Sequence, residues 1–534
     1  MLKMLKEEIL KICVEKKVLL DNEVLEVFKG VENLEIVRLV IEKIKNKTQK
    51  KFITKEILKS NEDLLEGFFK DSFENKEHFK KLKIKLGLNL EILTTSCSCD
   101  ENGENCGAVK VASSCPALAK KLEVKDFIKH FRNRFNNFRN ILEVHPVLKN
   151  IVSINKISGK KGSFSIIGLV FEKRVTKNKN IILEVEDLTG RVKLLVSNSN
   201  KELYEKAQDI ALDSILGFNC TGSNNFLFVN SFVFPEANIP LRKKSHLEEY
   251  ALFIGDLHYG SNKFMEKEFL NFIKYLNGEL SHDPEVKKIK YLFIVGDLIT
   301  GVGNYPNQEK DLKIANLEQQ FEGLANLLSQ IRKDIKIIIC PGNHDCVRLM
   351  EPQPLLNEKY AWPLYDLENV ILVENPTNIN IASTNNFEGF DVLMYHGFSF
   401  PHYANNIPSL ITSHAMDCPE KIMKYLLMNR HLAPTHNSVQ SYPCEKDAHF
   451  VKIVPDIFVS GHTHKSGVFY YNNILLVSVS TWETMTPYQE KFGNEPDHCK
   501  VPMVNLKTRV VKILDFEDPV INKKEEIVER GIVE

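Results

Sequence analysis

The second half of the chain contains five short apolar runs, and polar residues follow each run directly. Consecutive Val, Ile, Leu and Phe residues over four or five positions are typical of strands that are buried on both faces. Buried strands of this kind occur in α/β folds, in which helices cover the sheet. The runs lie at 251–254, 291–295, 335–339, 392–395 and 457–460. They predict an α/β domain over residues 245–516.

Residues 145–240 have a different pattern, in which short strand-like segments dominate. Three such segments are followed by a helical piece at 200–209 and then by two more. Three strands, a helix and two strands form the order of a five-stranded OB-fold barrel. Such barrels bind single-stranded nucleic acid through basic and aromatic side chains, but many bind proteins instead. Composition does not distinguish the two. The five segments lie at 163–171, 180–187, 188–196, 214–220 and 225–230.

The N-terminal part predicts helices and a linker. Apolar residues recur at helical spacing within residues 1–85, which we expect to form a small helical domain. A Cys- and Ser-rich linker is expected at 86–120, and an amphipathic connecting helix at 121–144. One face of that helix carries a stripe of Phe, and Arg134 is one of the basic residues elsewhere on it. We interpret it as a core stripe with a solvated basic face, and a nucleic-acid-binding helix is the alternative.

The composition is that of an ordinary globular protein. Hydrophobic residues make up 43% and charged residues 26% of the 534 positions. This length suits about three domains of ~100–200 residues each. No apolar stretch approaches the ~20 residues that span a membrane, and the N-terminus has no signal-peptide core. We therefore expect a cytoplasmic protein with no membrane partner.

The net charge is zero, but its distribution is uneven. Residues 1–250 carry 43 Lys and Arg against 34 Asp and Glu, and the remainder carries 27 against 36. A basic first half suits contact with a polyanion or an acidic partner. Solvated lysine faces are common, so the division by itself assigns no partner.

Eleven cysteines are present, and an odd number argues against a disulfide framework. Four of them, Cys97, Cys99, Cys106 and Cys115, cluster in the expected linker. Their spacing does not match a standard zinc pattern. We expect a flexible linker that carries cysteines, with a bound zinc ion as the alternative.

Candidate chemistry lies in the residues that follow the five apolar runs. Because α/β sheets present ligands at the carboxyl ends of their strands, we expect these side chains along one edge of one sheet. Carboxylates and imidazoles suit Mn, Fe, Zn and similar ions. Two ions about 3.5–4 Å apart can hold the attacking and leaving oxygens of a phosphoryl transfer. Asp297 stands alone in its motif and is the candidate to bridge two ions. The predicted ligands are Asp256, His258, Asp297, Asn343, His396, His462 and His464.

These motifs resemble those of the calcineurin-like metallophosphoesterases, which are D-x-H, GD, GNH[DE], H-G and GHTH. All five are present in that family's order. The resemblance implies a β-sandwich flanked by helices and two divalent ions. It implies that one ion is held by Asp256, His258, Asp297 and His464. It implies that the other is held by Asp297, Asn343, His396 and His462.

The same resemblance assigns roles beside the ligands. His344 resembles the catalytic histidine, which protonates the leaving oxygen or stabilises the transition state. Asp345 would orient His344 through a hydrogen bond. Manganese is the metal that the family suggests, whereas the ligand set alone would accept zinc, iron or nickel.

An OB-like barrel followed by intact phosphoesterase motifs resembles the small subunits of archaeal family D DNA polymerases. The segments 341–354, 395–400 and 480–489 support this likeness, which covers about 145–516. It implies a 3′-to-5′ exonuclease on single-stranded or primer-template DNA that proofreads for a separate large polymerase subunit in a heterodimer or larger complex. Magnesium would then serve the polymerase complex. The alternatives are an assembly subunit with little nuclease activity and a free-standing metallophosphatase or nucleotidase.

Four further expectations concern the rest of the second half and the activity of the chain. Segment 398–456 joins the strands that precede His396 and His462, so we expect it to wall the site, with Arg430 and His431 facing DNA phosphates. A packed excursion away from the site is the alternative. Residues 501–514 should complete the sheet, and a charged tail is expected at 517–534. Because no polymerase carboxylates are apparent, we expect nucleotide incorporation only with a large subunit.

Overall fold

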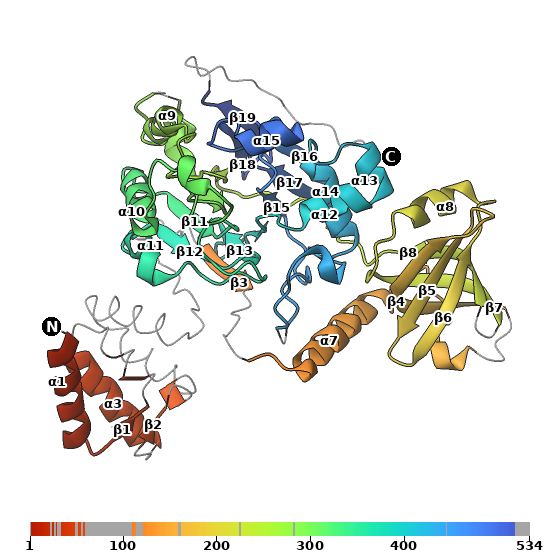
Figure 1. Ribbon diagram of the computed structural model, residues 1–534, viewed down its shortest axis with the longest axis horizontal. Coiled ribbons are helices and arrows are strands. Elements are labelled where there is room, and N and C mark those ends of the chain that lie inside the picture. Colours follow the sequence, from red (N-terminus) through yellow and green to blue (C-terminus); the bar gives the residue numbers. More distant parts are fainter. Residues whose placement is uncertain are drawn as a thin grey trace. The chain divides into compact units, whose positions relative to one another are not determined.

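The chain forms two compact units, Met1–Leu93 and Thr94–Glu534, in the computed structural model (Figure 1). The four clustered cysteines and residues 518–534 lie outside the described residues. No helix of the described part is long and apolar enough to cross a membrane. The structure describes residues 2–21, 24–25, 28, 34–48, 52–54, 57–58, 109–113, 121–157, 162–223, 226–280, 283–444 and 446–517.

The first unit contains the helices that the spacing predicts. They are α1 (Leu2–Glu15) and α3 (Leu34–Thr48), and a short parallel pair, β1 (Leu19–Leu20) with β2 (Phe52–Ile53), accompanies them. The buried apolar residues of both helices share one cluster, because a repeat of three and four positions places them on one helix face. This cluster includes Ile9, Ile12, Val37, Val40, Ile41 and Ile44.

The second unit begins its regular structure with an edge strand and a long helix. Strand β3 (Val109–Ser113) pairs antiparallel with β13 (Thr377–Ile381). The expected linker at 86–120 therefore contains a strand, which its small polar surroundings concealed. Helix α7 (Val124–Leu142) follows. Its Phe stripe is partly in a core, but the basic face is not wholly solvated, because Arg134 is buried and donates to the carbonyl of Pro434.

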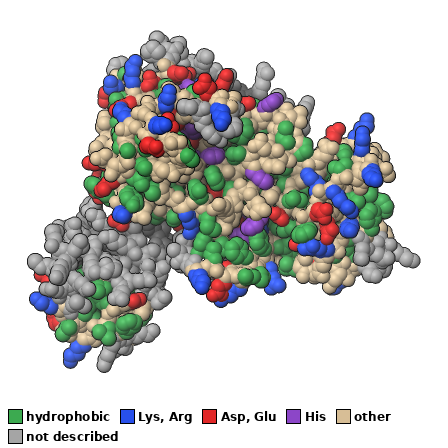
Figure 2. Space-filling model, in the orientation of Figure 1, with side chains coloured by type: hydrophobic (Ala, Val, Ile, Leu, Met, Phe, Trp, Pro, Cys, Tyr) green, Lys and Arg blue, Asp and Glu red, His purple; other side chains and the backbone are tan. Residues whose placement is uncertain are grey.

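A closed five-stranded barrel follows, as the strand pattern predicts. The strands close in the order β4-β5-β6-β8-β7. Residues alternate between the barrel interior and solvent along β5 and β6, as the two-residue period of a strand requires. Basic and acidic side chains intermingle over the barrel on the face seen in Figure 2, without a patch of one sign. The elements are β4 (Ser163–Val175), β5 (Ile181–Asp187), β6 (Gly190–Val196), α8 (Lys201–Gln208), β7 (Ile215–Ser223) and β8 (Phe226–Val233).

Two six-stranded sheets make up the rest of the unit. The first has the order β12-β11-β10-β9-β18-β19, in which β9 to β12 are parallel. Its strands are β9 (Tyr250–Ile254), β10 (Ile289–Val295), β11 (Lys336–Cys340), β12 (Val370–Leu372), β18 (Lys500–Asn505) and β19 (Val511–Asp515). Strands β18 and β19 confirm that residues 501–514 complete a sheet.

The second sheet has the order β16-β17-β15-β14-β13-β3, in which β14, β15 and β17 are parallel. Its remaining strands are β14 (Phe390–Met394), β15 (Ile457–Ser460), β16 (Gly467–Tyr471) and β17 (Ile474–Ser478). The two sheets share an apolar cluster, to which β9 contributes Phe253 and β14 contributes Val392. They therefore pack face to face.

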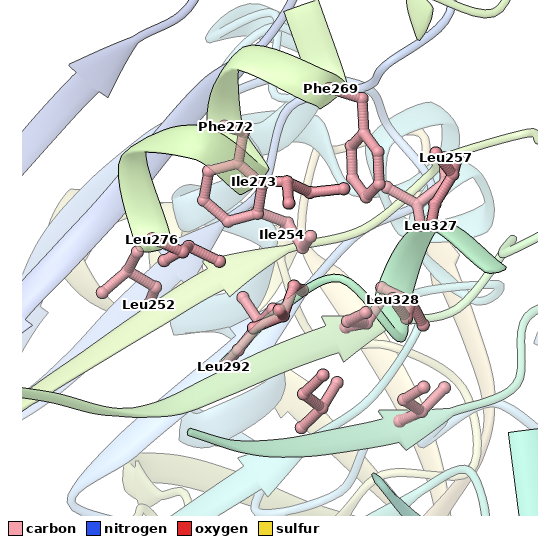
Figure 3. Packing of buried hydrophobic residues seen from close by; sticks show 14 of the residues in the cluster. Leu252, Ile254, Leu257, Phe269, Phe272, Ile273, Leu276, Leu292, Leu327 and Leu328 are labelled. Atoms are coloured by element: carbon pink, nitrogen blue, oxygen red, sulfur yellow. The ribbon is translucent and has the colours of Figure 1, made fainter. Parts of the chain in front are cut away.

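Helices cover the outer faces of both sheets. Leu252 and Ile254 alternate with Phe253 along β9 and pack against α9 and α10, including Phe269, Phe272 and Leu328 (Figure 3). The outer face of the second sheet packs against α12 to α14. The strands that precede the five motifs are covered on both faces, so they appear in the sequence as continuous apolar runs. The helices are α9 (Glu266–Leu276), α10 (Leu317–Leu328), α11 (Glu358–Tyr365), α12 (Phe400–Asn406), α13 (Pro408–Thr412), α14 (Pro419–Met428) and α15 (Pro487–Phe492).

Candidate metal centre

The five motifs converge where two sheets end, not at the edge of one sheet as the sequence led us to expect. Three follow β9, β10 and β11 in the first sheet, and two follow β14 and β15 in the second. Apolar runs identify strands but carry no information about which sheet a strand joins. Within the described part of the chain, three groups of side chains could each hold a metal ion, with their ligand atoms within 4.8 Å of one another. The groups are Asp256, His258 and His464; His258, Asp297 and His344; and Asp297, His396 and His462.

The backbone at these motifs adopts a conformation that few residue types favour. Five of the predicted ligands have φ between 47° and 69°, the left-handed region. Non-glycine residues there cost of order 1–3 kcal/mol each, and such strain clusters at functional sites. The chain therefore turns directly after β9, β10 and β15. These five are Asp256, His258, Asp297, His462 and His464.

Two glycines permit the close approach of the carboxylates. A Cβ at Gly342 would lie 2.3 Å from Oδ1 of Asp297. A Cβ at Gly461 would lie 2.6 Å from Oδ2 of Asp256. Any side chain at either position would therefore displace a carboxylate of the site.

The first group joins Asp256 and His258 of the first sheet to His464 of the second. The Nε2 atoms of the two histidines are 3.2 Å apart, and Nε2 of His464 is 3.6 Å from Oδ1 of Asp256. Burial lowers the pKa of both histidines, so their rings are neutral near pH 7. Neutral imidazole is the form that binds metal. On the far side of the His464 ring, Nδ1 is 2.8 Å from Nε2 of Gln489, which the sequence did not identify.

The site that we call the second group comprises Asp297, His396 and His462 together with Asn343. Nδ1 of His396 donates to the carbonyl of Val295 at 3.0 Å, so Nε2 of the neutral ring carries a lone pair. That Nε2 faces Oδ1 of Asn343 at 3.1 Å and Oδ2 of Asp297 at 3.3 Å. Burial lowers the pKa of His396, but Asp297 raises it to about 10, so this ring carries a proton on Nε2 near pH 7. A metal cation would take the place of that proton among the three acceptor atoms.

Asp297 lies between the two groups. Its Oδ2 is 3.3 Å from Nε2 of His396 and 3.9 Å from Nε2 of His258. Burial raises the pKa of Asp297, but the charges of His396 and His344 lower it well below its usual value. Burial lowers the pKa of His462, the remaining histidine of the second group, to about 3. The centre thus combines the ionised carboxylate of Asp297 with the neutral rings of His258, His462 and His464.

His344 and Asp345 lie in the turn after β11, and one prediction about them is wrong. Nδ1 of His344 is 3.0 Å from the carbonyl oxygen of Thr300, which can accept a hydrogen bond from it, and 3.1 Å from Nδ2 of Asn304. Asp345 accepts instead from the backbone N–H groups of Leu298, Ile299 and Gly342. Among the described residues no hydrogen bond joins Asp345 to His344. Asp345 is 1% exposed and stabilises the turns, because its side chain points into the fold.

Arg430 and His431 do not join this group. The guanidinium of Arg430 donates to the carbonyls of Val451 and Lys452. His431 is 2% exposed, and its Nε2 is 3.0 Å from Oδ2 of Asp447. Both side chains thus have protein partners, and phosphate contact for them stays a prediction. The segment that carries them does begin at the site, since the ring of Phe398 is 5.5 Å from that of His462.

Comparisons with known proteins give consistent findings. A family model for the B-subunits of DNA polymerases alpha and epsilon matches residues 251–468. The DNA polymerase II small subunit of Methanothermobacter thermautotrophicus is 34% identical over 398 residues, which cover 74% of this chain and 80% of that protein. The small subunit of the same name from Pyrococcus furiosus is 38% identical over 403 residues, covering 74% of this chain and 64% of that protein. The DNA polymerase II small subunit of Archaeoglobus fulgidus is 33% identical, and the alignment covers 78% of this chain and 82% of that protein.

Solved structures add less. An archaeal phosphodiesterase aligns with 50% of this chain and 98% of its own length, at 10% identity. Its TM-score of 0.25 is too low to establish a common fold.

Proposed function

The chain belongs to the family of archaeal DNA polymerase II small subunits, those of family D, and from this we propose that its metal centre is a 3′-to-5′ exonuclease. In this proposal it proofreads single-stranded ends for a separate large polymerase subunit. The observation that carries it is the convergence of carboxylates and imidazoles from five motifs on one point. Hydrolysis of a phosphodiester is the reaction that such a centre suits.

The donor set fits two divalent ions, with manganese as the leading metal and zinc, iron or nickel compatible with it. One ion would lie among Asp256, His258, Asp297 and His464. The other would lie among Asp297, Asn343, His396 and His462. The position of Asp297 between the groups supports its role as the bridge. When bound, the ions supply positive charge to the attacking and leaving oxygens of an in-line displacement.

His344 would act as the proton donor in this reaction. Water attacks the phosphorus and releases a proton to solvent, the bond from phosphorus to the 3′ oxygen breaks, and that oxygen takes a proton from His344. In the doubly protonated ring the Nδ1 proton is directed at the Thr300 carbonyl, and the Nε2 proton is the one that is delivered. The T-shaped contact with the His258 ring, at 4.9 Å between centroids, places His344 beside the first group.

The architecture supports a calcineurin-like phosphoesterase domain at 245–516 preceded by an OB-fold domain at 145–240. The support is two packed sheets with helices on both outer faces, and a closed barrel in the strand order given above. DNA and the large subunit are the partners in this proposal, with magnesium serving the polymerase complex.

Hydrolysis assays on the purified chain and on its complex with a large subunit test this function. We expect manganese-dependent shortening of 5′-labelled single-stranded DNA from its 3′ end and little turnover of bis(p-nitrophenyl) phosphate. Faster turnover of the small ester than of DNA would favour a free-standing phosphatase. Turnover of neither, alone or in the complex, would favour an assembly subunit. Nucleotide incorporation is expected only from the complex.

A further inference from the structure

Two buried amides form one unit behind the metal centre. Gln353 is 2% exposed and Asn375 is 0% exposed. Their backbones exchange two hydrogen bonds, from N of Gln353 to O of Asn375 at 2.7 Å and in reverse at 3.1 Å. In addition, Nδ2 of Asn375 donates to Oε1 of Gln353 at 2.7 Å. Three hydrogen bonds therefore hold these two residues together.

The remaining amide atoms of the two side chains bind the backbone of motifs that follow strands of the two sheets. Nε2 of Gln353 donates to the carbonyl of Gly342 at 3.3 Å, in the motif after β11 of the first sheet. Oδ1 of Asn375 accepts from the backbone N–H of His396 at 2.9 Å, in the motif after β14 of the second sheet. The Gly342 carbonyl belongs to the peptide that leads into Asn343. Each end thus contacts the backbone of one predicted ligand of the second group.

Glu351, two residues before Gln353, binds the residue that follows β14. Oε2 of Glu351 accepts from the hydroxyl of Tyr395 at 3.1 Å and lies 2.7 Å from Nε2 of His449. Tyr395 directly precedes His396. Glu351 therefore contacts Tyr395 while Asn375 contacts His396, so two successive residues after β14 have partners here.

Hydrogen bonds between the two sheets can fix the relative position of the predicted metal ligands. The two sheets also share an apolar cluster, and apolar contact is non-directional. Hydrogen bonds impose a defined distance and angle. Asn343 and His396 must stay in register across the sheets, since Oδ1 of one is 3.1 Å from Nε2 of the other.

We propose that Gln353 and Asn375 are positioning residues that set the separation of Asn343 and His396, and so determine the affinity of the second group for its ion. This inference rests on the proposed two-metal centre. The first group, with Asp256, His258 and His464, has no hydrogen bond to either amide among the contacts of the described residues. The effect of losing the pair is therefore selective for one ion.

Manganese titration by calorimetry, with bound metal counted by mass spectrometry, tests the proposal. Gln353→Met keeps the side-chain size and the backbone pair but removes both amide hydrogen bonds. Loss of a partner behind a metal ligand weakens metal binding by about 10–100-fold. We expect this loss for one ion while the other binds as in the wild type, and the same pattern for Asn375→Leu.

The matched control is Asn369→Leu. Asn369 is also buried, at 1% exposed, but its amide donates to the carbonyl of Ile335 at 3.0 Å, away from the motifs. This variant should lower the melting temperature without changing the binding of either ion. If it shows the same selective loss, general destabilisation explains the effect and the proposal is wrong.

The remaining outcomes separate the inference from the proposed function. A wild-type chain that binds fewer than two ions contradicts the two-metal centre itself. A wild-type chain that binds two, together with variants that bind both ions equally well, contradicts only the positioning role. If Gln353→Met does not fold, Gln353→Glu keeps the acceptor for Asn375 but places a carboxylate against the Gly342 carbonyl. Gln353→Glu must then bind one of the two manganese ions more weakly and the other as the wild type does.

Discussion

Replacement of His344 by alanine separates proton donation from metal binding. The side chain is half-exposed, and its Nδ1 contacts the Thr300 carbonyl. That carbonyl also accepts from the amides of Asn304 and Gln308, so the substitution leaves it with two donors. Loss of one ordinary hydrogen bond costs about 0.5–1.5 kcal/mol. We therefore expect a small fall in stability.

The expected loss of activity is much larger. General acid catalysis contributes about 10²–10⁴-fold, which corresponds to about 2.7–5.4 kcal/mol in the activation barrier. His344→Ala should lose that factor in single-turnover cleavage of single-stranded DNA while it keeps its bound metal. His145→Ala, a partly exposed histidine in the segment between α7 and the barrel, serves as the control and should cleave normally. Depletion of metal by His344→Ala, or turnover within tenfold of wild type, would refute the role.

The remaining predictions concern the ligands, a glycine and the two residues that the structure places elsewhere. Asp297→Ala should abolish hydrolysis and lose more metal than His464→Ala, because Asp297 lies between both groups; equal losses in elemental analysis would argue against a bridge. Gly342→Ala should cost about 1–3 kcal/mol of stability and most of the activity, because its Cβ would meet Asp297 at 2.3 Å; an active, metal-replete variant would contradict this. Replacement of Arg430 and His431 tests phosphate contact through the salt dependence of DNA binding, whose slope falls by about one for each phosphate-binding side chain that is removed. An unchanged slope with a lower melting temperature would show that Arg430 and His431 stabilise the fold through their protein partners and do not contact phosphate.

Much of the fold could be predicted because its signals are local. A strand covered on both faces leaves an apolar run, and all five predicted runs correspond to strands, such as 457–460 with β15. The barrel strands alternate every second residue, and the turn at Thr189 and Gly190 follows from the Asp187 side chain, which accepts from both backbone N–H groups. These features depend on a few neighbouring residues.

The features that escaped prediction depend on contacts between distant residues. The assignment of β14 to a second sheet, and of β3 to the edge of that sheet, follows from packing rather than from either segment. The partners of Asp345 depend on how two turns meet. Gln353 and Asn375 are isolated amides in the sequence, without a motif to mark them. The candidate ligands could be found from their motifs, whereas the residues that position them could not.

Diffraction from crystals grown with manganese, measured at the manganese absorption edge, tests the two-metal centre. We expect two anomalous peaks about 3.5–4 Å apart where the two sheets end. One should be bound by Asp256, His258 and His464, the other by Asn343, His396 and His462, and both by Asp297. A single peak, no peak, or peaks bound by other residues would contradict the two-metal centre.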